Sequence, residues 1–174
     1  MSTKSTRRAP AGALLALGAY VATIPAANLA VEQIGLVPTG FGQVAPAGVY
    51  MVGLALVLRD FAREVAGRGA VLAAVVVGVA LSYLLASPEL AAASAVAFGV
   101  SELLDFAVYE PLRKRGFLSA MLASNAVGLA VDSLLFLWLA FDSLEYLPGQ
   151  LFGKAWMTLL AALAIVARRR CAAR

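Results

Sequence analysis

The chain has 174 residues, of which 62% are hydrophobic and only 14% are charged, and its net charge is +4. A soluble domain carries about a quarter charged residues, so the composition excludes an ordinary soluble domain and predicts a single-domain membrane protein with the lipid bilayer as its surroundings. The basic residues fall in short clusters between apolar segments and form no continuous basic face, which argues against a nucleic-acid partner.

Two further classes of site are excluded by composition. The chain has no histidine and a single cysteine, Cys171, near its C-terminal end. Imidazole metal ligands, a histidine proton relay and an intramolecular disulfide are therefore not expected. We predict neither a metal site nor a cofactor.

Six apolar segments predict an all-α, polytopic protein with six transmembrane helices, because each is close to the roughly 20 residues that cross a bilayer. The segments run at about 10–33, 45–65, 69–87, 89–109, 117–141 and 148–167. Basic clusters occur before the first segment, between the second and third, between the fourth and fifth, and at the end of the chain. If successive segments cross the membrane in opposite directions, all these clusters lie on the same side. The positive-inside rule assigns that side to the cytoplasm, so both termini are predicted to be cytoplasmic. The membrane expected is a bacterial inner (plasma) membrane.

The first segment has a second interpretation as a secretory signal peptide. It has a basic start, the apolar run LLALGAYVATI and the small residues of IPAANLA, which a signal peptidase could accept. However, its uncharged run from residue 9 to 31 suits a full span better. Asn28 within this run is a candidate site residue.

The second segment brings a charged pair close to the membrane. Arg59 and Asp60 follow an uncharged run of only 15 residues that starts at Val44. They are expected near the inner boundary, where a salt bridge or simple anchoring is at least as plausible as contact with a solute. Asp60 is nevertheless a candidate.

The fourth segment carries two acids inside the membrane. Only 12 uncharged residues separate Glu89 from Glu102, so a span of about 20 residues must include both Glu102 and Asp105. Ionisable groups at such depth are costly, face the protein interior and mark solute or ion paths. Positions 102, 105 and 109 share one helical face. The alternative is that Asp105 and Tyr109 only anchor the helix at the cytoplasmic interface.

The fifth and sixth segments add three candidates. Asp132 is the only charged residue between Arg115 and Asp142, and Asn125 lies seven residues before it on the same face, with Gly128 between them. A structural hydrogen bond between helices is the alternative role for this pair. Lys154 is expected inside the last span, where a lysine can also snorkel to the interface.

The chemistry of this acid-rich interior favours a cationic solute or one with several N–H donors. A carboxylate can accept two parallel N–H bonds from a guanine-like edge. Aromatic side chains such as Phe98, Phe106, Phe136 and Trp138 could stack on a flat heterocycle.

Several motifs together resemble a known family. SELLDFAVYEPLR, AVDSLLF and LFGKAW occur in order, together with Asn28 and the segment 60–67. They resemble the queuosine-precursor transporter family, also labelled the VUT or vitamin uptake transporter family, over about residues 28–160. The resemblance implies a six-helix fold related to the substrate-binding components of energy-coupling-factor transporters, and uptake of 7-deazaguanine precursors such as 7-cyano-7-deazaguanine. It also implies that the family's polar positions are taken by Asn28, Asp60, Glu102, Asp105, Asp132 and Lys154.

The resulting hypothesis is a small-molecule importer. Glu102 and Asp132, supported by Asp105, would accept N–H bonds from a deazapurine-like substrate, and Asn125 would orient it. Lys154 would bond its carbonyl or balance an acid. The chain has no GxxxxGK[ST] loop, so ATP-driven transport would need separate subunits, such as an energy-coupling-factor-type module.

Two alternatives remain open. The chain could be the binding component for another vitamin-like solute that works with such a module, or a small non-transporting membrane scaffold whose polar residues hold helices together. An enzyme is not expected.

Overall fold

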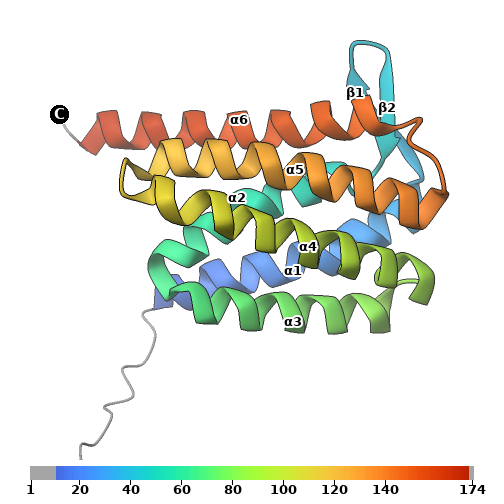
Figure 1. The fold of residues 1–174 in the computed structure, drawn as a ribbon, viewed down its shortest axis with the longest axis horizontal. Coiled ribbons are helices and arrows are strands. Elements are labelled where there is room, and N and C mark those ends of the chain that lie inside the picture. The colour runs from blue at the N-terminus through green and yellow to red at the C-terminus, as the bar shows by residue number, and fades with distance from the viewer. Residues whose placement is uncertain (1–10, 173–174) are drawn as a thin grey trace, which may run out of the picture.

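The computed structural model describes residues 11–172, which form six helices and one β-hairpin. The helices are α1 (Ala11–Ile34), α2 (Val49–Ala66), α3 (Arg68–Leu85), α4 (Pro88–Arg113), α5 (Phe117–Phe141) and α6 (Leu147–Ala172), and the strands are β1 (Leu36–Gly40) and β2 (Gln43–Pro46). The helices lie side by side with their axes close to one direction (Figure 1). Lys4, Arg7, Arg8 and Arg174, which support the predicted orientation, lie outside the described residues.

Four of these helices are long and apolar enough to cross a membrane: α1, α3, α4 and α5. This helical architecture fits an all-α membrane protein. Helix α2 has 18 residues and carries Arg59, Asp60, Arg63 and Glu64 in its second half. Those charges explain why α2 does not qualify by composition, and their partners are described below.

The connection between α1 and α2 is a β-hairpin, which the apolar pattern did not predict. β1 and β2 pair antiparallel, with Leu36 opposite Pro46 and Val37 opposite Ala45. The turn places Gly40 and Gly42 at φ values of 101° and 73°, which glycine adopts without steric cost. The backbone hydrogen bonds of this segment delay the start of α2 to Val49, four residues after the expected start at 45.

The hairpin rests against the first turns of α6. The indole N–H of Trp156 donates to the carbonyl of Thr39 at 3.2 Å. Gly149 and Gly153 lie so close to the hairpin and to α2 that a Cβ at Gly149 would overlap the carbonyl of Val44, and one at Gly153 would lie 2.6 Å from a methyl of Val49. The hairpin therefore marks one end of the bundle and is packed against it.

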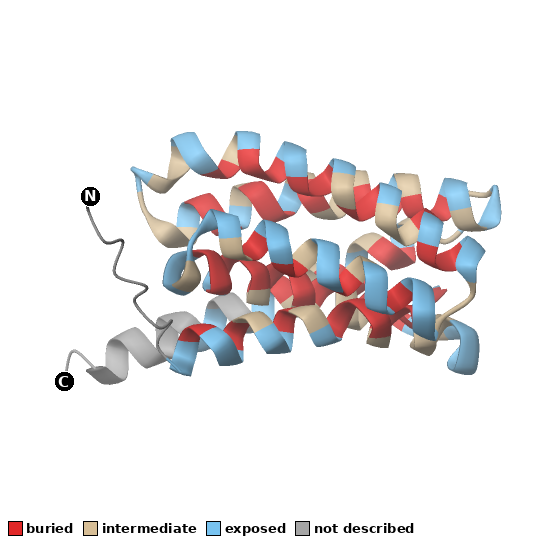
Figure 2. Ribbon diagram, turned by 90° about the horizontal axis from the view of Figure 1, so that it is seen from below, coloured by how far each residue is buried: buried red, intermediate tan, exposed pale blue. Residues whose placement is uncertain are grey.

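Buried positions face the centre of the bundle and exposed ones face outward, as Figure 2 shows. One apolar cluster joins Tyr20 and Ile24 of α1 to Ala55, Val71 and Phe98 of α2, α3 and α4. Large apolar side chains also cover the outside, including Val76, Leu84, Leu103 and Trp138. An apolar exterior of this kind is suited to lipid, and buried polar groups then have to find partners inside the bundle.

Close packing of α2 on α6 depends on Gly53. A Cβ there would lie 2.8 Å from Cβ of Met157 and 3.0 Å from Cα of Lys154. Replacing Gly53 with alanine should therefore lower the free energy of unfolding by about 1–3 kcal/mol, as overpacking does. Gly99→Ala is the matched control, because nothing lies within 4 Å of a Cβ at that position of α4, and helix propensity there favours alanine by up to about 1 kcal/mol. Thermal unfolding of the two purified variants in one detergent checks this, and equal melting temperatures would contradict the packing argument.

Candidate functional site

Buried polar side chains form two groups inside the bundle. One group surrounds Arg59 and is called here the Arg59 network; its members are Arg59, Asp60, Arg63, Glu102, Asp105 and Asn125. The other group lines a pocket that opens between α1, α2, α4, α5 and α6. All members of the network are less than a tenth exposed. Burying their polar and charged groups is costly unless these groups are hydrogen-bonded or paired, so each of them needs a partner inside the bundle.

Arg59 is the hub of the first group and is 0% exposed. Its Nη1 donates to Oε1 of Glu102 at 2.6 Å. Its Nη2 donates to Oδ1 of Asp105 at 2.7 Å and to Oδ1 of Asn125 at 2.9 Å. Asp60, the next residue on α2, accepts from Nε at 3.0 Å and from Nη2 at 2.9 Å. One guanidinium thus ties α2 to α4 and α5.

Arginine suits this position because its planar guanidinium donates in several directions at once and stays charged. The position of Arg59 in the sequence predicts a salt bridge near the inner boundary; in the structure Arg59 is fully buried with three carboxylates around it. Burying a charge without a partner is costly, so arginine and acids stabilise one another's burial. The cationic partner of Glu102 and Asp105 is therefore the Arg59 side chain of the protein itself.

Arg63 is the second cation of the network and lies one turn after Arg59 on α2. Its Nη2 is 3.7 Å from Oδ2 of Asp105, and its guanidinium lies over the rings of Phe106 at 3.8 Å and Tyr109 at 4.1 Å. The hydroxyl of Tyr109 donates to Glu64 at 2.7 Å. These cation–π and hydrogen-bonded contacts join α2 to α4 at the end of the bundle away from the hairpin.

The pocket contains a second buried ion pair. Lys154 of α6 donates from Nζ to Oδ2 of Asp132 on α5 at 2.6 Å, and to Oγ of Ser133 at 2.8 Å. Lys154 is 0% exposed, so its ammonium is held inside the bundle and does not snorkel to the interface. Gln150, one turn before Lys154 on the same helix, also lines the pocket.

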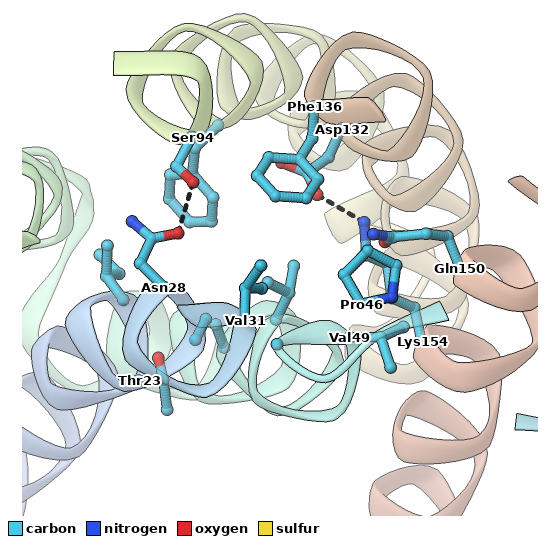
Figure 3. Close-up of a pocket in the computed structure, with 16 residues that line it drawn as sticks. Thr23, Asn28, Val31, Pro46, Val49, Ser94, Asp132, Phe136, Gln150 and Lys154 are labelled. Carbon is cyan, nitrogen blue, oxygen red and sulfur yellow. Dashed lines mark hydrogen bonds and ion pairs between the residues drawn. The ribbon is translucent and has the colours of Figure 1, made fainter. Parts of the chain in front are cut away.

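A neutral polar pair faces this ion pair across the pocket. Oγ of Ser94 on α4 donates to Oδ1 of Asn28 on α1 at 2.6 Å, and the Asn28 amide N–H donates to Ser82 of α3. Figure 3 shows Asn28 and Ser94 on one side of the pocket and Asp132 and Lys154 on the other. The pocket therefore offers donors and acceptors on opposite sides.

The remaining walls are apolar, with Val31, Val49, Phe98 and Phe136 among them. The empty space, including solvent at the mouth, is about 510 Å³. That upper bound limits a ligand to a small molecule. An apolar cleft with a few convergent polar groups is the usual form of a small-molecule site.

The pocket and the Arg59 network are stacked along the bundle. Pro46 and Gly48 line the pocket, so it lies in the half that carries the hairpin. Ala55 and Phe98 also line it, and Arg59 and Glu102 follow them by one helical turn on α2 and α4.

Gly128 of α5 marks the boundary between these two layers. A Cβ at Gly128 would lie 3.7 Å from Oδ1 of Asp105 and 3.9 Å from Nη1 of Arg59. Asp132 comes one turn later on the same helix and faces the pocket. Because Gly128 has no side chain, Arg59 and Asp105 can lie close to α5, directly next to the pocket.

The structure thus divides the predicted site residues between the two groups. Asn28, Asp132 and Lys154 line the pocket. Asp60, Glu102, Asp105 and Asn125 instead bond to Arg59 and are not among the lining residues. Within the described chain, no group of three or more His, Cys, Asp or Glu residues could hold a metal ion.

Sequence reasoning did not single out Ser94 and Gln150 as site residues. Helical spacing was the available signal for both. Ser94 lies eight residues before Glu102, with Phe98 between them, and Gln150 lies four residues before Lys154. Positions four apart share a helix face. Helical spacing did not indicate that Arg59 would contact three carboxylates at once.

The helical bundle with its apolar exterior is that of a multi-pass membrane protein, and its mainly apolar pocket carries a few buried polar groups. The family model described as "Putative vitamin uptake transporter" matches residues 81–167, half of the chain, and the chain belongs to this family of vitamin-type uptake transporters. The matched region runs from the end of α3 into α6 and includes Glu102, Asp132 and Lys154. Neither a curated protein nor a solved structure matches the chain.

Proposed function

We propose that the protein imports a small heterocyclic solute of the 7-deazaguanine class, such as the queuosine precursor 7-cyano-7-deazaguanine, and binds it in the pocket. Membership of a vitamin-type uptake family supports transport of a small solute. The observation that carries the proposal is the Asp132–Lys154 pair at 2.6 Å facing Asn28 and Ser94 across the pocket. An enzymatic role finds no support in this family.

The chemistry of a guanine-like edge fits these groups. Such an edge presents adjacent N–H donors next to a carbonyl oxygen. The Asp132 carboxylate accepts the N–H groups and the Lys154 ammonium donates to the carbonyl. Because Asp132 and Lys154 are already bonded to each other, the solute has to share or replace that bond, which selects for a ligand offering both donors and an acceptor.

The rest of the pocket completes the recognition. Asn28 and Ser94 lie opposite and can bond the far edge of a flat ring. The aromatic rings of Phe98 and Phe136 line the walls, where they can stack on such a ring. Glu102, Asp105, Asn125 and Asp60 are proposed to support the pocket from below and not to touch the solute.

For the whole chain we propose six spans in the bacterial plasma membrane, with both termini cytoplasmic and the hairpin outside. Phe41 at the hairpin tip is 74% exposed, and the exposed Lys114 follows α4 at the other end. In a Cys171→Ser background, Phe41→Cys should react with an impermeant maleimide added to intact cells, whereas Lys114→Cys should react only after lysis. The reverse pattern would contradict the orientation.

Uptake of labelled 7-cyano-7-deazaguanine tests the function. Cells that lack its synthesis should accumulate the label only when they express this chain. Vesicles that contain the purified chain alone should also take it up, and this result would exclude an obligatory energy-coupling-factor-type module. Uptake that requires a co-purifying ATPase pair would instead favour the binding-component role. No uptake in either system, with the chain shown to be in the membrane, would refute this substrate.

A further inference from the structure

The Arg59 network contains one more acid than base. Its carboxylates are Asp60, Glu102 and Asp105, and its cations are Arg59 and Arg63. Two neighbouring acids are already matched, since Glu64 pairs with Arg113 and Asp132 with Lys154. Arg68 lies over Phe106 but is exposed, so it does not balance the buried acids. A surplus charge at this depth is costly, so the network is balanced when it holds one proton.

Of the three acids in the network, Glu102 is the one held by a single hydrogen bond from a single cation. Asp60 receives two N–H bonds from Arg59, and Asp105 lies between Arg59 and Arg63. Glu102 receives one bond, from Arg59 Nη1 to Oε1. Its Oε2 is buried with no hydrogen-bond partner in residues 11–172, and the same is true of Oδ2 of Asp60 and Oδ2 of Asp105. The single bond from one cation, and not the free oxygen, therefore distinguishes Glu102.

A second buried group without a partner lies on the neighbouring helix α1. The hydroxyl of Tyr20 is buried and has no hydrogen-bond partner in the described part of the chain. The Tyr20 ring packs at 6.2 Å between centroids on Phe98, which comes one helical turn before Glu102 on α4. In this inference the Tyr20 oxygen is the acceptor for the O–H of a protonated Glu102.

We propose that Glu102 is the proton-binding site of this transporter and that one proton enters with each solute molecule. This inference rests on the proposed function, because it concerns what drives that transport. The step is a simple proton transfer: the proton is taken up by Oε2 from the outer side and given up to water on the cytoplasmic side.

Solute and proton are linked through water in the pocket. Glu102 does not line the pocket, but in the empty protein water in the pocket one turn above it lowers the cost of the surplus charge through space, because water is far more polar than the protein interior. A bound solute displaces that water, so the charged form of Glu102 becomes more costly and proton binding becomes more favourable. By reciprocity the proton then strengthens solute binding by the same factor. Without solute, Glu102 keeps its proton at neutral pH but releases it more readily to the more alkaline cytoplasmic side. The empty protein can then return to the outward-facing state without a proton, which is the condition for coupled uptake.

Every helix packed around Glu102 contributes to its electrostatic surroundings. The titratable and charged groups near it are Tyr20 on α1, Arg59, Asp60, Arg63 and Glu64 on α2, Arg68 on α3, Asp105, Tyr109 and Arg113 on α4, Asp132 on α5 and Lys154 on α6. Arg68 is exposed and lies over Phe106.

Infrared spectroscopy of the purified protein tests the proton without any solute. At neutral pH the wild-type protein should show the C=O stretch of a buried protonated carboxylic acid, shifted in D₂O. Glu102→Gln should lose this band, while Glu110→Gln, the same change at an exposed position of α4, should keep it. If the wild-type protein shows no such band, or if the band survives in Glu102→Gln, the proposal is overturned. A wild-type spectrum without this band overturns the proposal even if the variant does not fold.

Transport by vesicles that contain the chain alone tests the coupling. With acid outside, wild type and Glu110→Gln should accumulate labelled 7-cyano-7-deazaguanine above the external concentration. Glu102→Gln should lose the accumulation driven by the pH gradient to a much greater extent than it loses exchange of internal for external solute. Accumulation equal to wild type in Glu102→Gln would overturn the coupling. If even the wild-type chain does not exchange this solute, the proposed substrate fails, whereas the infrared result still decides the proton site.

Discussion

Replacing Arg59 with methionine is expected to be the most damaging single change in this protein. The free energy of unfolding should fall by about 3–5 kcal/mol, the cost of removing one partner from a buried ion pair. Methionine fills much of the same space, but Asp60, Glu102 and Asp105 are left buried without their shared cation. The melting temperature in detergent and the amount of protein in the membrane measure the effect.

Two further variants serve as controls for Arg59→Met, one for the loss of any arginine and one for the loss of the positive charge. Arg68→Met removes an exposed arginine that lies over Phe106 at 4.5 Å, and it should cost no more than about 1 kcal/mol. Arg59→Lys keeps the charge but loses the planar fork that serves Glu102, Asp105 and Asn125 together, so its stability should fall between wild type and Arg59→Met. If Arg59→Met is as stable as Arg68→Met, the network does not hold the bundle together.

The second large effect is expected at Asp132 and Lys154. Either Asp132→Asn or Lys154→Met leaves a buried charge whose partner was 2.6 Å away, so both single variants should lose stability. Solute binding should weaken by about 2–5 kcal/mol, which is at least about 30-fold. Binding of 7-cyano-7-deazaguanine to the purified variants and their melting temperatures are the measurements.

The double variant Asp132→Asn/Lys154→Met separates binding from folding. It buries no charge at these positions, so its stability should exceed that of either single variant. Solute binding should nevertheless stay lost, because neither the carboxylate nor the ammonium remains. Asp142→Asn at the exposed end of α5 is the control, since asparagine tolerates the φ of 49° found there. Recovery of uptake in the double variant would show that the pair is structural and would favour the scaffold alternative.

The two predictions concern different layers of one interior, and this division was not visible in the sequence. The acids of the fourth segment were expected to accept N–H bonds from a solute. In the structure Glu102 and Asp105 accept them from Arg59, and the pocket begins one turn above. Of the predicted site residues, we therefore propose only Asn28, Asp132 and Lys154, together with other residues that line the pocket, as contacts of the solute.

The sequence by itself was enough to indicate a helical membrane protein with acids in its interior. Helix formation and lipid exposure depend on runs of neighbouring apolar residues, and the cost of a charge in the bilayer requires Glu102, Asp105 and Asp132 to face inward. These are local properties, readable along the chain. The motifs around them were also sufficient to indicate the uptake family.

Only the tertiary structure decided which partner each charge has. Arg59 meets Glu102, Asp105 and Asn125 across 43, 46 and 66 positions of sequence, and Asp132 meets Lys154 across 22. Such pairs depend on how helices cross and on where small residues such as Gly53 and Gly128 let them approach. No local pattern determines those crossings. The hairpin has the same origin, because its two short strands are stabilised by pairing with each other and by packing on α6.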